Sequence, residues 1–538
     1  MLRDQADRHP DAVVIVDGGT RVTMAELRAG AARVAHGLIE LGVRPGDRVA
    51  MWGVNDPYWV MHAFGIWDAG AVIVPLSPRA KGLEAAAMIA KTGAEVLVTG
   101  EGPPGVVLAD LLPPDTGPRH VLGPGTALGA RLLTEPAGVD RPRDVEGPRD
   151  VDRARDVGGP RDVGGPQEVR GPQEVEERAL AVRPGDLCEI MSTSGTTGTP
   201  KGVMLDHAQV LRGYWDWSEI VTLDEHDRYP VIAPFSHGFG LNAGLIACVL
   251  RRATMMPIRI FTPDALMSLI AEGRASILAG PPTLFHRLLD ELDRADWDVS
   301  SLRVAICGAA AVPAALITRL VERVGLERMI NAYGLMEGTV VSMTRAGDPI
   351  EVIATTTGRA VPGIEVRIVD DEGKVVAAGE RGEILQRGYG VMRGYWDEPG
   401  KTAEVVDPDG WLHTGDIGVL DPAGNLAIVD RKKELYIVNG FNVSPAEVES
   451  LLLREGSLAQ AAVIGVPDPV SGEAGWAYVV PRPGMTVDPG TLLGWAKDNM
   501  SNYKVPKRII VVEALPANAN GKIDKMVLRA RASAPEGR

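Results

Sequence analysis

Apolar and polar positions follow two different periods along the first 330 residues. Residues 24–42 space their apolar side chains as an amphipathic helix does and stop at a glycine. Residues 58–70 predict a second helix. Short apolar runs bounded by turn residues predict strands at 47–53, 71–76, 94–100, 275–280 and 302–308. Because helices and strands alternate, we expect an α/β fold with largely parallel sheets covered by helices.

The pattern changes beyond residue 365, where short strands are separated by turns. These strands predict an antiparallel, barrel-like subdomain and lie at 364–376, 381–388 and 410–430. The tail then predicts two helices and two strands, at 444–456, 461–466, 476–482 and 491–500. We therefore predict a large domain over residues 1–431 and a small, mobile α+β domain over residues 432–538.

Residues 142–177 do not fit either pattern, because they are six consecutive hexapeptides such as PRDVGG and PQEVRG. Each hexapeptide has one valine, whereas proline, glycine and charged residues dominate. A β-helix built from hexapeptides needs more apolar side chains in each turn. We expect a flexible surface loop without a functional role.

Composition narrows the possible partners. The chain has 56 basic and 71 acidic residues, a formal net charge of −15, which argues against nucleic acid or an anionic membrane as the main partner. The longest apolar stretch, residues 62–76, is interrupted by Asp68, so we expect no membrane span. Three separated cysteines predict neither disulfides nor a zinc site. A polar N-terminus without a signal-peptide core favours a cytoplasmic protein.

The stretch MSTSGTTGTPKGVMLDH, residues 191–207, combines glycines, hydroxyl groups and one lysine. An apolar run before it and a helical pattern after it predict a strand–loop–helix unit, an arrangement that can cradle phosphate with backbone N–H groups. The loop is not a Walker P-loop, because Lys201 follows a proline and no Ser or Thr follows the lysine. Taken alone, such a loop is also typical of a solvated connection.

The sequence of residues 193–202, TSGTTGTPKG, resembles the signature of the acyl-adenylate-forming superfamily, which includes acyl-CoA synthetases, luciferases and adenylation domains. Further motifs of that family follow in its order: PFSHGFG at 234–240, CGAAAVP at 307–313, NAYGLMEGT at 331–339, GEILQRGYGVMRGYW at 382–396, GWLHTGD at 410–416, DRKKELYIVNGFNVSPAEVE at 430–449 and NGKIDK at 520–525. The resemblance covers nearly the whole chain apart from the hexapeptides.

This resemblance implies a two-step ligase that uses ATP, Mg²⁺ and coenzyme A. A small-molecule carboxylic acid would attack the α-phosphorus of ATP, and a thiol would then displace AMP from the acyl-adenylate. We predict an AMP-forming acid–CoA ligase. Two alternatives remain open: an enzyme that passes acyl-AMP to a carrier protein or partner enzyme, and a catalytically inactive nucleotide-binding relative. A homodimer is a further possibility.

The resemblance also implies roles for individual residues. Lys522 would contact the carboxylate and the α-phosphate, and Glu337 would hold the metal. Asp416 would bind the ribose hydroxyls, Lys433 would be the hinge, and Gly440 would line the coenzyme A tunnel. The acyl pocket would include His237, Gly238, Gly240 and Gly308. The nucleotide would be bound by Thr193, Ser194, Gly195, Thr196, Thr197, Gly198, Lys201, Gly308, Ala309, Ala310, Asn331, Ala332, Tyr333, Gly334, Leu335, Met336, Asp416, Ile428 and Arg431.

Two of these positions carry a specific question. Met336 stands where the family usually has threonine, and a thioether cannot donate a hydrogen bond to phosphate, a loss of ~1–3 kcal/mol. We considered the hydroxyl of Thr339 as a substitute. His237 is flanked by apolar residues, so it would be either a core histidine or, by the resemblance, a gate at the acyl pocket.

The sequence around the acyl pocket favours a bulky acid. Residues 231–245 contain no acidic residue, so a substrate ammonium would be uncompensated there. Glycines at 238, 240 and 244 predict room for a wide acyl group. Residues 333–363 resemble bacterial ligases for steroid- or terpenoid-derived ring acids.

Overall fold

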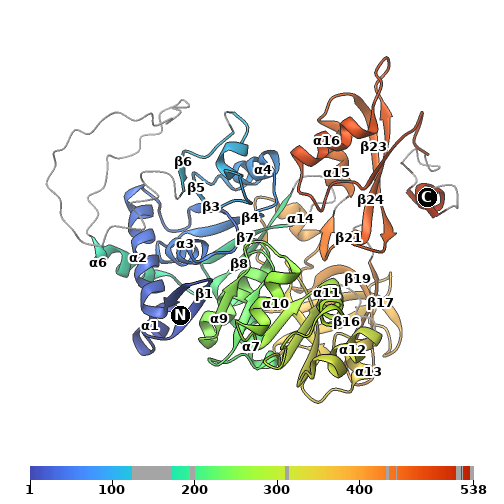
Figure 1. The fold of residues 1–538 in the computed structure, drawn as a ribbon. Helices are drawn as coiled ribbons and strands as arrows, with labels where there is room; N and C mark the ends of the chain where they lie inside the picture. Colours follow the sequence, from blue (N-terminus) through green and yellow to red (C-terminus); the bar gives the residue numbers. More distant parts are fainter. Residues whose placement is uncertain are drawn as a thin grey trace, which may run out of the picture.

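The computed structural model describes residues 1–114, 116–123, 171–193, 200–308, 314–431, 436–443, 445–516, 523 and 525–533. Its strands form five sheets, four in the large N-terminal part and one in the C-terminal part (Figure 1). The predicted α/β architecture, with a large N-terminal and a small C-terminal domain, is confirmed.

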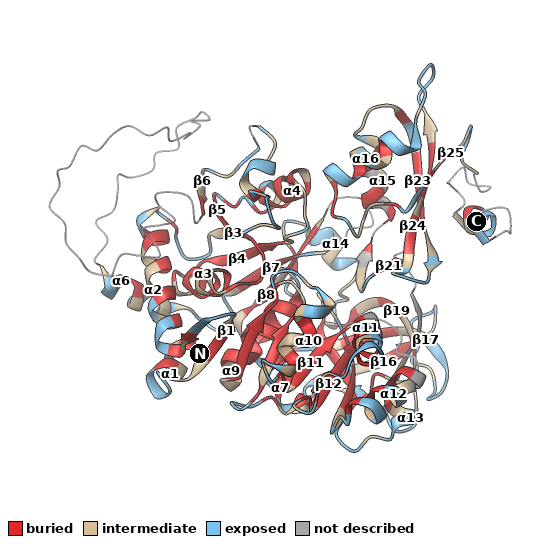
Figure 2. Cartoon of the chain, viewed as in Figure 1, coloured by how far each residue is buried: buried red, intermediate tan, exposed pale blue. Residues whose placement is uncertain are grey.

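The largest sheet has seven strands in the order β18-β8-β7-β4-β3-β5-β6. Its strands are β3 (Arg48–Trp52), β4 (Val72–Leu76), β5 (Val96–Thr99), β6 (His120–Leu122), β7 (Leu187–Thr193), β8 (Lys201–Asp206) and β18 (Gly394–Tyr395). The central pairs β3–β4, β3–β5 and β4–β7 are parallel, and β3, β4 and β5 are almost wholly buried (Figure 2). Strands buried on both faces read as continuous apolar runs, which is why the sequence identified these three.

Two further sheets complete the α/β part. One has the order β11-β12-β13-β14-β15 and consists of β11 (Ile277–Gly280), β12 (Val304–Gly308), β13 (Arg328–Leu335), β14 (Thr339–Met343) and β15 (Arg359–Ala360). The other has the order β2-β1-β10-β9 and consists of β1 (Val13–Asp17), β2 (Thr20–Thr23), β9 (Arg228–Val231) and β10 (Thr254–Pro257). In the first of these sheets β11, β12 and β13 are parallel, so their carboxyl ends share one edge.

Helices cover these sheets, and some of them begin at a side-chain cap. Helix α2 (Met24–Glu40) starts with a capping box in which Thr23 N–H donates to Glu26 and the Thr23 hydroxyl accepts from Glu26 N–H. The other helical segments of this part are α1 (Leu2–Arg8), α3 (Pro57–Asp68), α4 (Gly82–Thr92), η1 (Leu108–Leu111), α6 (Pro172–Ala181), α7 (His207–Val221), α8 (Gly238–Gly240), η2 (Leu241–Ile246), α9 (Ala247–Arg251), α10 (Pro263–Ala271), α11 (Pro282–Arg294), α12 (Ala314–Val324), α13 (Ile350–Thr355) and α14 (Pro399–Ala403).

The predicted barrel-like subdomain is a four-stranded antiparallel sheet in the order β16-β17-β19-β20. Its strands are β16 (Ile364–Val369), β17 (Arg381–Gly388), β19 (Leu412–Leu420) and β20 (Leu426–Arg431). Burial does not alternate strictly along these strands: Ile384, Leu385 and Gln386 are three successive buried residues of β17, and Ile368 and Val369 are both buried in β16.

The C-terminal part has its own sheet and its own core. Its strands are β21 (Tyr436–Val438), β22 (Phe441–Val443), β23 (Leu458–Asp468), β24 (Gly472–Pro481) and β25 (Arg508–Val511), and its helices are α15 (Pro445–Leu453), α16 (Pro489–Asn499) and α17 (Lys525–Ser533). Val448, Leu452, Val463 and Val479 are completely buried in its core. This cluster contains no residue of the N-terminal sheets.

The predicted strand–loop–helix unit around residue 195 is wrong in one respect. Strand β8 lies between the loop and α7 and pairs antiparallel with β7, so the loop connects two strands of a hairpin. Val203 and Leu205 of β8 are buried in the core, which holds this strand against the sheet. Lys201 is therefore the first residue of a strand that the sequence pattern did not predict, whereas the predicted helix begins at His207.

The hexapeptide tract also differs from the prediction at its end. Most of the tract lies outside the described residues, but its last unit begins helix α6 (Pro172–Ala181). Val175 is buried, and the Glu176 carboxylate lies 2.8 Å from Arg28 and 3.0 Å from Arg3. These contacts order the sixth unit, because it supplies the apolar residue and the charges that face α1 and α2.

The three cysteines are free thiols, as the sequence predicts. Cys188, Cys248 and Cys307 are free and buried, and burial raises the pKa of each thiol. Within the part of the chain that the structure describes, no helix combines the length and apolar character needed to cross a membrane.

Candidate active site at the edge of the five-stranded sheet

The residues predicted to surround adenine meet at the carboxyl ends of β12 and β13. Gly308 pairs with Ala332 across the parallel register, and a Cβ atom on Gly308 would lie 2.9 Å from the Ala332 carbonyl oxygen. The adjacent strand β11 ends at Gly280, which pairs with Cys307 at the same edge. Carboxyl edges of parallel strands are the usual ligand sites of open α/β sheets. Ala309 and Ala310 lie outside the described residues.

The predicted ribose residues come from a second sheet that faces this edge. The Tyr333 hydroxyl donates a hydrogen bond to Asp416 Oδ2 over 2.6 Å, and both side chains are buried. On the β19–β20 hairpin Asp416 pairs with Arg431, and Gly418 pairs with Ile428, whose side chain is exposed. One hydrogen bond thus connects the predicted adenine strand to the predicted ribose hairpin.

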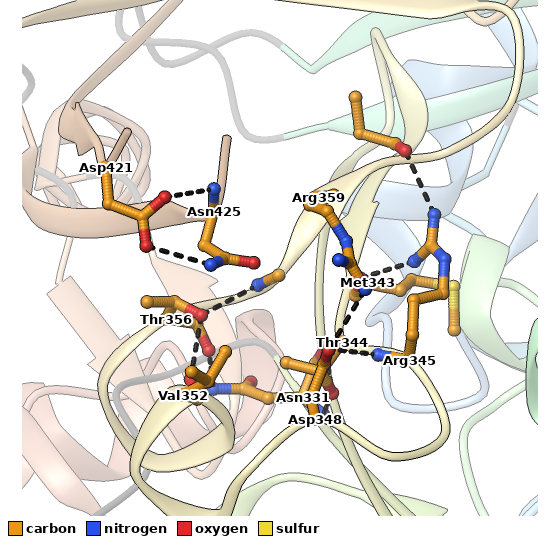
Figure 3. Close-up of polar contacts among 12 residues, drawn as sticks. Asn331, Met343, Thr344, Arg345, Asp348, Val352, Thr356, Arg359, Asp421 and Asn425 are labelled. Atoms are coloured by element: carbon orange, nitrogen blue, oxygen red, sulfur yellow. Dashed lines mark hydrogen bonds and ion pairs between the residues drawn. The ribbon is translucent and has the colours of Figure 1, made fainter. Parts of the chain in front are cut away.

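The side chain of Asn331 has a structural role that the sequence did not predict. Its amide donates to the carbonyl oxygens of Ile353 and Thr356 at the end of α13. Figure 3 shows Asn331 among its neighbours Thr344 and Thr356. The backbone N–H of Asn331 donates to the hydroxyl of Thr344. Asn331 is buried, so this amide holds α13 against β13, and a contact of its side chain with adenine stays a prediction.

The predicted phosphate side centres on three side chains from different elements. Lys201 pairs with Thr193 across the β7–β8 hairpin, is only 8 % exposed, and places its ammonium 4.2 Å from the centre of the Tyr395 ring. The Tyr395 hydroxyl donates to Glu337 Oε1 over 2.9 Å. Burial, followed by the Glu337 carboxylate, raises the pKa of Tyr395, so this hydroxyl keeps its proton and remains a donor.

The loop between Thr193 and Lys201 is fixed at its exit. Lys91 Nζ donates to the Pro200 carbonyl oxygen over 2.7 Å and to the Glu398 carboxylate over 2.6 Å. Sequence reasoning missed both partners because α4 and α14 are remote from the loop along the chain. The predicted phosphate ligands Ser194, Gly195, Thr196, Thr197 and Gly198 lie outside the described residues.

Glu337 is compatible with the predicted metal. A magnesium ion bound with nucleotide takes one or two carboxylates together with phosphate oxygens and water. Glu337 is partly exposed, and only its Oε1 atom is engaged by Tyr395. Among the described residues no three His, Cys, Asp or Glu side chains are grouped as a metal cage, which suits a metal carried largely by phosphate.

Met336 and Gly238 face each other at the predicted acyl pocket. A Cβ atom on Gly238 would lie 3.2 Å from the Met336 sulfur and 3.8 Å from the Tyr214 hydroxyl. At Gly240 the glycine is needed for backbone packing and not for the acyl pocket, because a Cβ there would lie 2.1 Å from the Pro234 carbonyl oxygen. Gly244 is packed against Val231 in the same way. Of these three glycines, only Gly238 adjoins the side chain of a predicted site residue.

The Thr339 hydroxyl does not replace the missing donor at residue 336. Thr339 has a left-handed backbone, with φ of 56°, and is buried. Its Oγ1 atom would lie 2.6 Å from a Cβ placed on Gly390 and finds no hydrogen-bond partner among the described residues. This hydroxyl is enclosed between α7 and the loop at residue 390, so it is not directed to Met336.

His237 is exposed, although desolvation by its surroundings lowers the pKa of its imidazole, which favours a residue that lines a pocket over a core histidine. Its Nδ1 atom accepts a hydrogen bond from the Phe239 N–H and so caps the short helix α8. The ring is fixed from behind, and its other edge can face solvent or a ligand.

An acidic residue of strand β7 contacts residues 231–245, which contain no acidic residue themselves. Glu189 of β7 is completely buried and accepts a hydrogen bond from Asn242 Nδ2 over 2.8 Å. Burial raises the pKa of this carboxyl to about 7. Since no surface of Glu189 is exposed, it does not offer a partner to a substrate ammonium.

Gly440 lies where the two domains touch. Asn439 and Gly440, with φ of 51° and 82°, form the two-residue turn between β21 and β22, for which Asn-Gly is the favoured sequence. A Cβ atom on Gly440 would lie 3.2 Å from Pro281, which follows β11. The turn of the small domain thus reaches the edge occupied by Gly308. Lys433 and Lys522 lie outside the described residues.

Comparison with known proteins identifies the family. Residues 2–396 match the family described as AMP-binding enzyme, and residues 447–522 match the AMP-binding enzyme C-terminal domain. The chain belongs to the AMP-binding enzyme family. The acyl-adenylate-forming resemblance read from the motifs is thereby confirmed.

Proteins similar to this chain include two that are named as CoA-thioester-forming enzymes. The chain is 40 % identical to the 3-[(3aS,4S,7aS)-7a-methyl-1,5-dioxo-octahydro-1H-inden-4-yl]propanoyl:CoA ligase of Rhodococcus jostii, over 98 % of this chain and 97 % of that protein. It is 36 % identical to a feruloyl-CoA synthase of an Amycolatopsis species, with the same coverage. The predicted acyl-CoA synthetase branch is confirmed.

Solved structures of this AMP-binding enzyme family superpose on the chain to different degrees. A double mutant of o-succinylbenzoate CoA synthetase from Bacillus subtilis, bound to the product analogue OSB-NCoA, fits with a TM-score of 0.80, 25 % identity and 98 % coverage of both chains. ATP-bound MatB from Rhodopseudomonas palustris fits with a TM-score of 0.65 and 27 % identity, with 100 % of this chain and 98 % of that chain covered.

Proposed function

We propose that this protein is an ATP-dependent ligase that joins a hydrophobic, ring-containing carboxylic acid to coenzyme A. One substrate oxygen attacks the α-phosphorus of ATP, and pyrophosphate leaves. The thiol sulfur of coenzyme A then attacks the acyl carbon of the adenylate, AMP leaves, and the thiol proton is released. The observation that carries the proposal is the hydrogen bond from Tyr333 to Asp416 beside the Lys201–Tyr395–Glu337 group.

These contacts support a division of the nucleotide site into two ends. At one end Asp416 accepts from the ribose hydroxyls, while Arg431 and Ile428 border the sugar. At the other end Lys201 and the residue 194–199 loop neutralise and cradle phosphate oxygens. Mg²⁺ held by Glu337 would add positive charge where the triphosphate accumulates negative charge. Adenine lies along Gly308, Ala332, Gly334 and Leu335.

The second domain supplies a group to each half-reaction. Lys522 enters for adenylate formation and contacts the carboxylate and α-phosphate, whereas Gly440 lines the path of the coenzyme A arm in thioester formation. Lys433 is the hinge between domains that span residues 1–431 and 432–538. The position of Gly440 against Pro281 supports this use of the interface.

The acyl group is proposed to be bulky and apolar and to lie between His237, Gly238 and Met336. The absence of a side chain on Gly238 leaves space beside the Met336 thioether. The two relatives, whose products carry a hydrogenated indene or a feruloyl group, support ring acids. We further propose that the enzyme is cytoplasmic and acts as a homodimer.

The test supplies ATP, Mg²⁺ and coenzyme A with a panel of acids and detects acyl-AMP and acyl-CoA by mass. The panel contains ferulic acid, the methyl-dioxo-octahydroindenyl propanoic acid and decanoic acid. We expect thioester from the ring acids at a higher rate than from decanoic acid. Adenylate without thioester would point to another acceptor, and neither product would overturn the proposal.

Lys522→Ala tests the assignment of the two half-reactions. The variant should lose adenylate formation but still convert supplied acyl-AMP to thioester, because Lys522 acts only in the first step. Lys497→Ala, which removes an exposed lysine of α16 in the same domain, serves as the matched control. Equal loss of both half-reactions in the Lys522 variant would contradict this role.

A further inference from the structure

A buried ionic contact joins α4 of the large domain to the segment after α16 of the small domain. Helix α16 lies beside α4 in Figure 1, and the segment after α16 carries Ser501 and Lys504. Glu84, in the first turn of α4, is 8 % exposed and Ser501 is 1 % exposed. Glu84, Ser501 and Lys504 lie outside the motifs that carry the family resemblance.

The Glu84 carboxylate accepts four hydrogen bonds. One comes from within its own helix start, because the Lys81 N–H donates to Oε2 over 2.9 Å. Three come from the small domain: the Ser501 N–H and hydroxyl donate to Oε2 over 3.1 and 2.9 Å, and the Lys504 ammonium donates to Oε1 over 2.7 Å. A carboxylate with this many donors is firmly oriented.

Lys504 lies between two carboxylates, one from each domain. Its ammonium donates to Glu84 of α4 and to Glu447 of α15, each over 2.7 Å, and its side chain is 11 % exposed. Although burial opposes the charge, the neighbouring Tyr503, Glu447 and Glu84 raise the pKa of Lys504 well above its usual value. The lysine is therefore a permanent cation at this interface.

An aromatic contact lies next to the ionic one. The Arg79 guanidinium lies 4.8 Å from the centre of the Phe441 ring, and Phe441 stacks on Tyr503 with ring centres 4.5 Å apart. Phe441 directly follows Gly440, so this contact and the ionic one together fix the hairpin that carries the predicted coenzyme A residue.

Separation of the domains would leave no buried charge without a partner. Lys504 would keep Glu447, because both residues belong to the small domain. Glu84 would keep the N–H of Lys81, because both belong to the start of α4. Breaking a buried ion pair is costly mainly when one charge is left buried alone. This contact can therefore open and close repeatedly at low cost.

The proposed coenzyme A residue lies at the active-site edge in this structure, because a Cβ atom on Gly440 would lie 3.2 Å from Pro281, which follows β11. The contact of Glu84 with Ser501 and Lys504 therefore belongs to the arrangement in which the Gly440 turn reaches that edge.

We propose that Glu84 is a positioning residue for thioester formation, which holds the small domain in the coenzyme A-accepting arrangement through Ser501 and Lys504. Glu84 does not touch the reacting atoms and acts by keeping the Gly440 turn at the active-site edge. This inference rests on the proposed two-step function.

The experiment measures the two half-reactions separately in Glu84→Gln. Glutamine retains the acceptor for Lys81 N–H but removes the charge that binds Lys504. We expect the conversion of supplied acyl-AMP to thioester to slow about tenfold, which is the size of effect expected for losing charge-assisted hydrogen bonds. The exchange of pyrophosphate into ATP should stay at the wild-type rate.

Two further variants make the result specific. Glu26→Gln is the matched control, because Glu26 closes a capping box at α2 but is exposed and remote from the small domain. It should leave both half-reactions unchanged. Ser501→Ala should slow thioester formation alone, and adding it to Glu84→Gln should cause little further loss, because Ser501 acts through Glu84.

Hydrogen exchange gives a readout that does not need activity. Glutamine can still accept from the Ser501 N–H, but the loss of the charge that binds Lys504 should let the domains separate more often, so exchange of the Ser501 N–H should become faster in Glu84→Gln and not in Glu26→Gln. Equal slowing of both half-reactions, an unchanged thioester rate or unchanged exchange at Ser501 would overturn the inference. A wild-type protein that makes no thioester would instead overturn the proposed function, while the exchange experiment would still test the contact.

Discussion

The hydroxyl of Tyr333 and the carboxylate of Asp416 are joined by a 2.6 Å hydrogen bond between two different sheets. Tyr333 ends up beside Gly308 through β13, and Asp416 stands opposite Arg431 in the β19–β20 hairpin. The bond sets the distance between the two sheets at the point where a nucleoside would lie. Its contribution to ATP binding can be measured by removing only the Tyr333 hydroxyl.

Tyr333→Phe should raise the KM for ATP about tenfold with a smaller change in kcat. The ring remains, but the carboxylate of Asp416 loses a donor, and hydrogen bonds to charged groups contribute about 1.5–3 kcal/mol. ATP–pyrophosphate exchange at varied ATP checks this. A change in kcat alone would mean that the hydroxyl does not orient Asp416 for binding.

Met336→Thr should increase the rate of adenylate formation and reduce the difference in KM between preferred and other acids. Threonine restores a donor near phosphate but also removes the sulfur that adjoins Gly238. Gly238→Ala should raise the KM for bulky acids, because its Cβ would lie 3.2 Å from that sulfur and fill the space beside it. Acid KM values for both single variants and the double variant check this. Additive effects would contradict contact between the two positions.

Glu189→Gln should change the pH dependence of stability. Burial raises the pKa of Glu189 from 4.5 to about 7, so the folded state binds a proton that the unfolded state releases, and stability is lost as pH rises through that range. The full loss in the free energy of unfolding is about 3 kcal/mol. The variant should therefore melt higher than wild type at pH 8 and similarly at pH 5. A constant offset at both pH values would contradict this account.

Glu337→Gln should raise the Mg²⁺ concentration needed for half-maximal adenylate formation. The glutamine amide can still accept from the Tyr395 hydroxyl, so the local packing is retained while the anionic ligand is lost. Tyr395→Phe provides the comparison, since it keeps the carboxylate and removes only the donor. An unchanged Mg²⁺ requirement in Glu337→Gln would place the metal elsewhere.

Deletion of residues 142–170 should leave the melting temperature and turnover close to wild type. Extending the deletion to residue 177 should lower the melting temperature, because it removes the start of α6 with buried Val175 and the Glu176 carboxylate between Arg3 and Arg28. Thermal melts of the two deletions check this. Equal stability would mean that α6 contributes nothing.

The sequence predicted those parts whose signal is local. The core strands β3, β4 and β5 have continuous apolar runs, and α2 has both the helical spacing and the terminal glycine. Strand β8 was missed because its six residues directly follow the glycine-rich loop and precede a strong helix signal. The buried Val203 and Leu205, at alternate positions, were the available sign.

The contacts between remote segments could not be predicted in this way. Glu84 follows Lys81 as a capping glutamate, a local role that gives no indication of Ser501, which lies 417 residues further on. The position of Lys91 against Pro200 and Glu398, and the distance between Tyr333 and Asp416, likewise depend on tertiary packing. The family motifs named the site residues, but their partners came from the fold.

The burial of all three native thiols has a practical consequence for watching this enzyme at work. With Cys188, Cys248 and Cys307 shielded and protonated, maleimide dyes will ignore the natural chain and attach only to cysteines introduced on the surface. A donor–acceptor pair, one dye on each domain, can therefore follow single molecules without first removing any native residue.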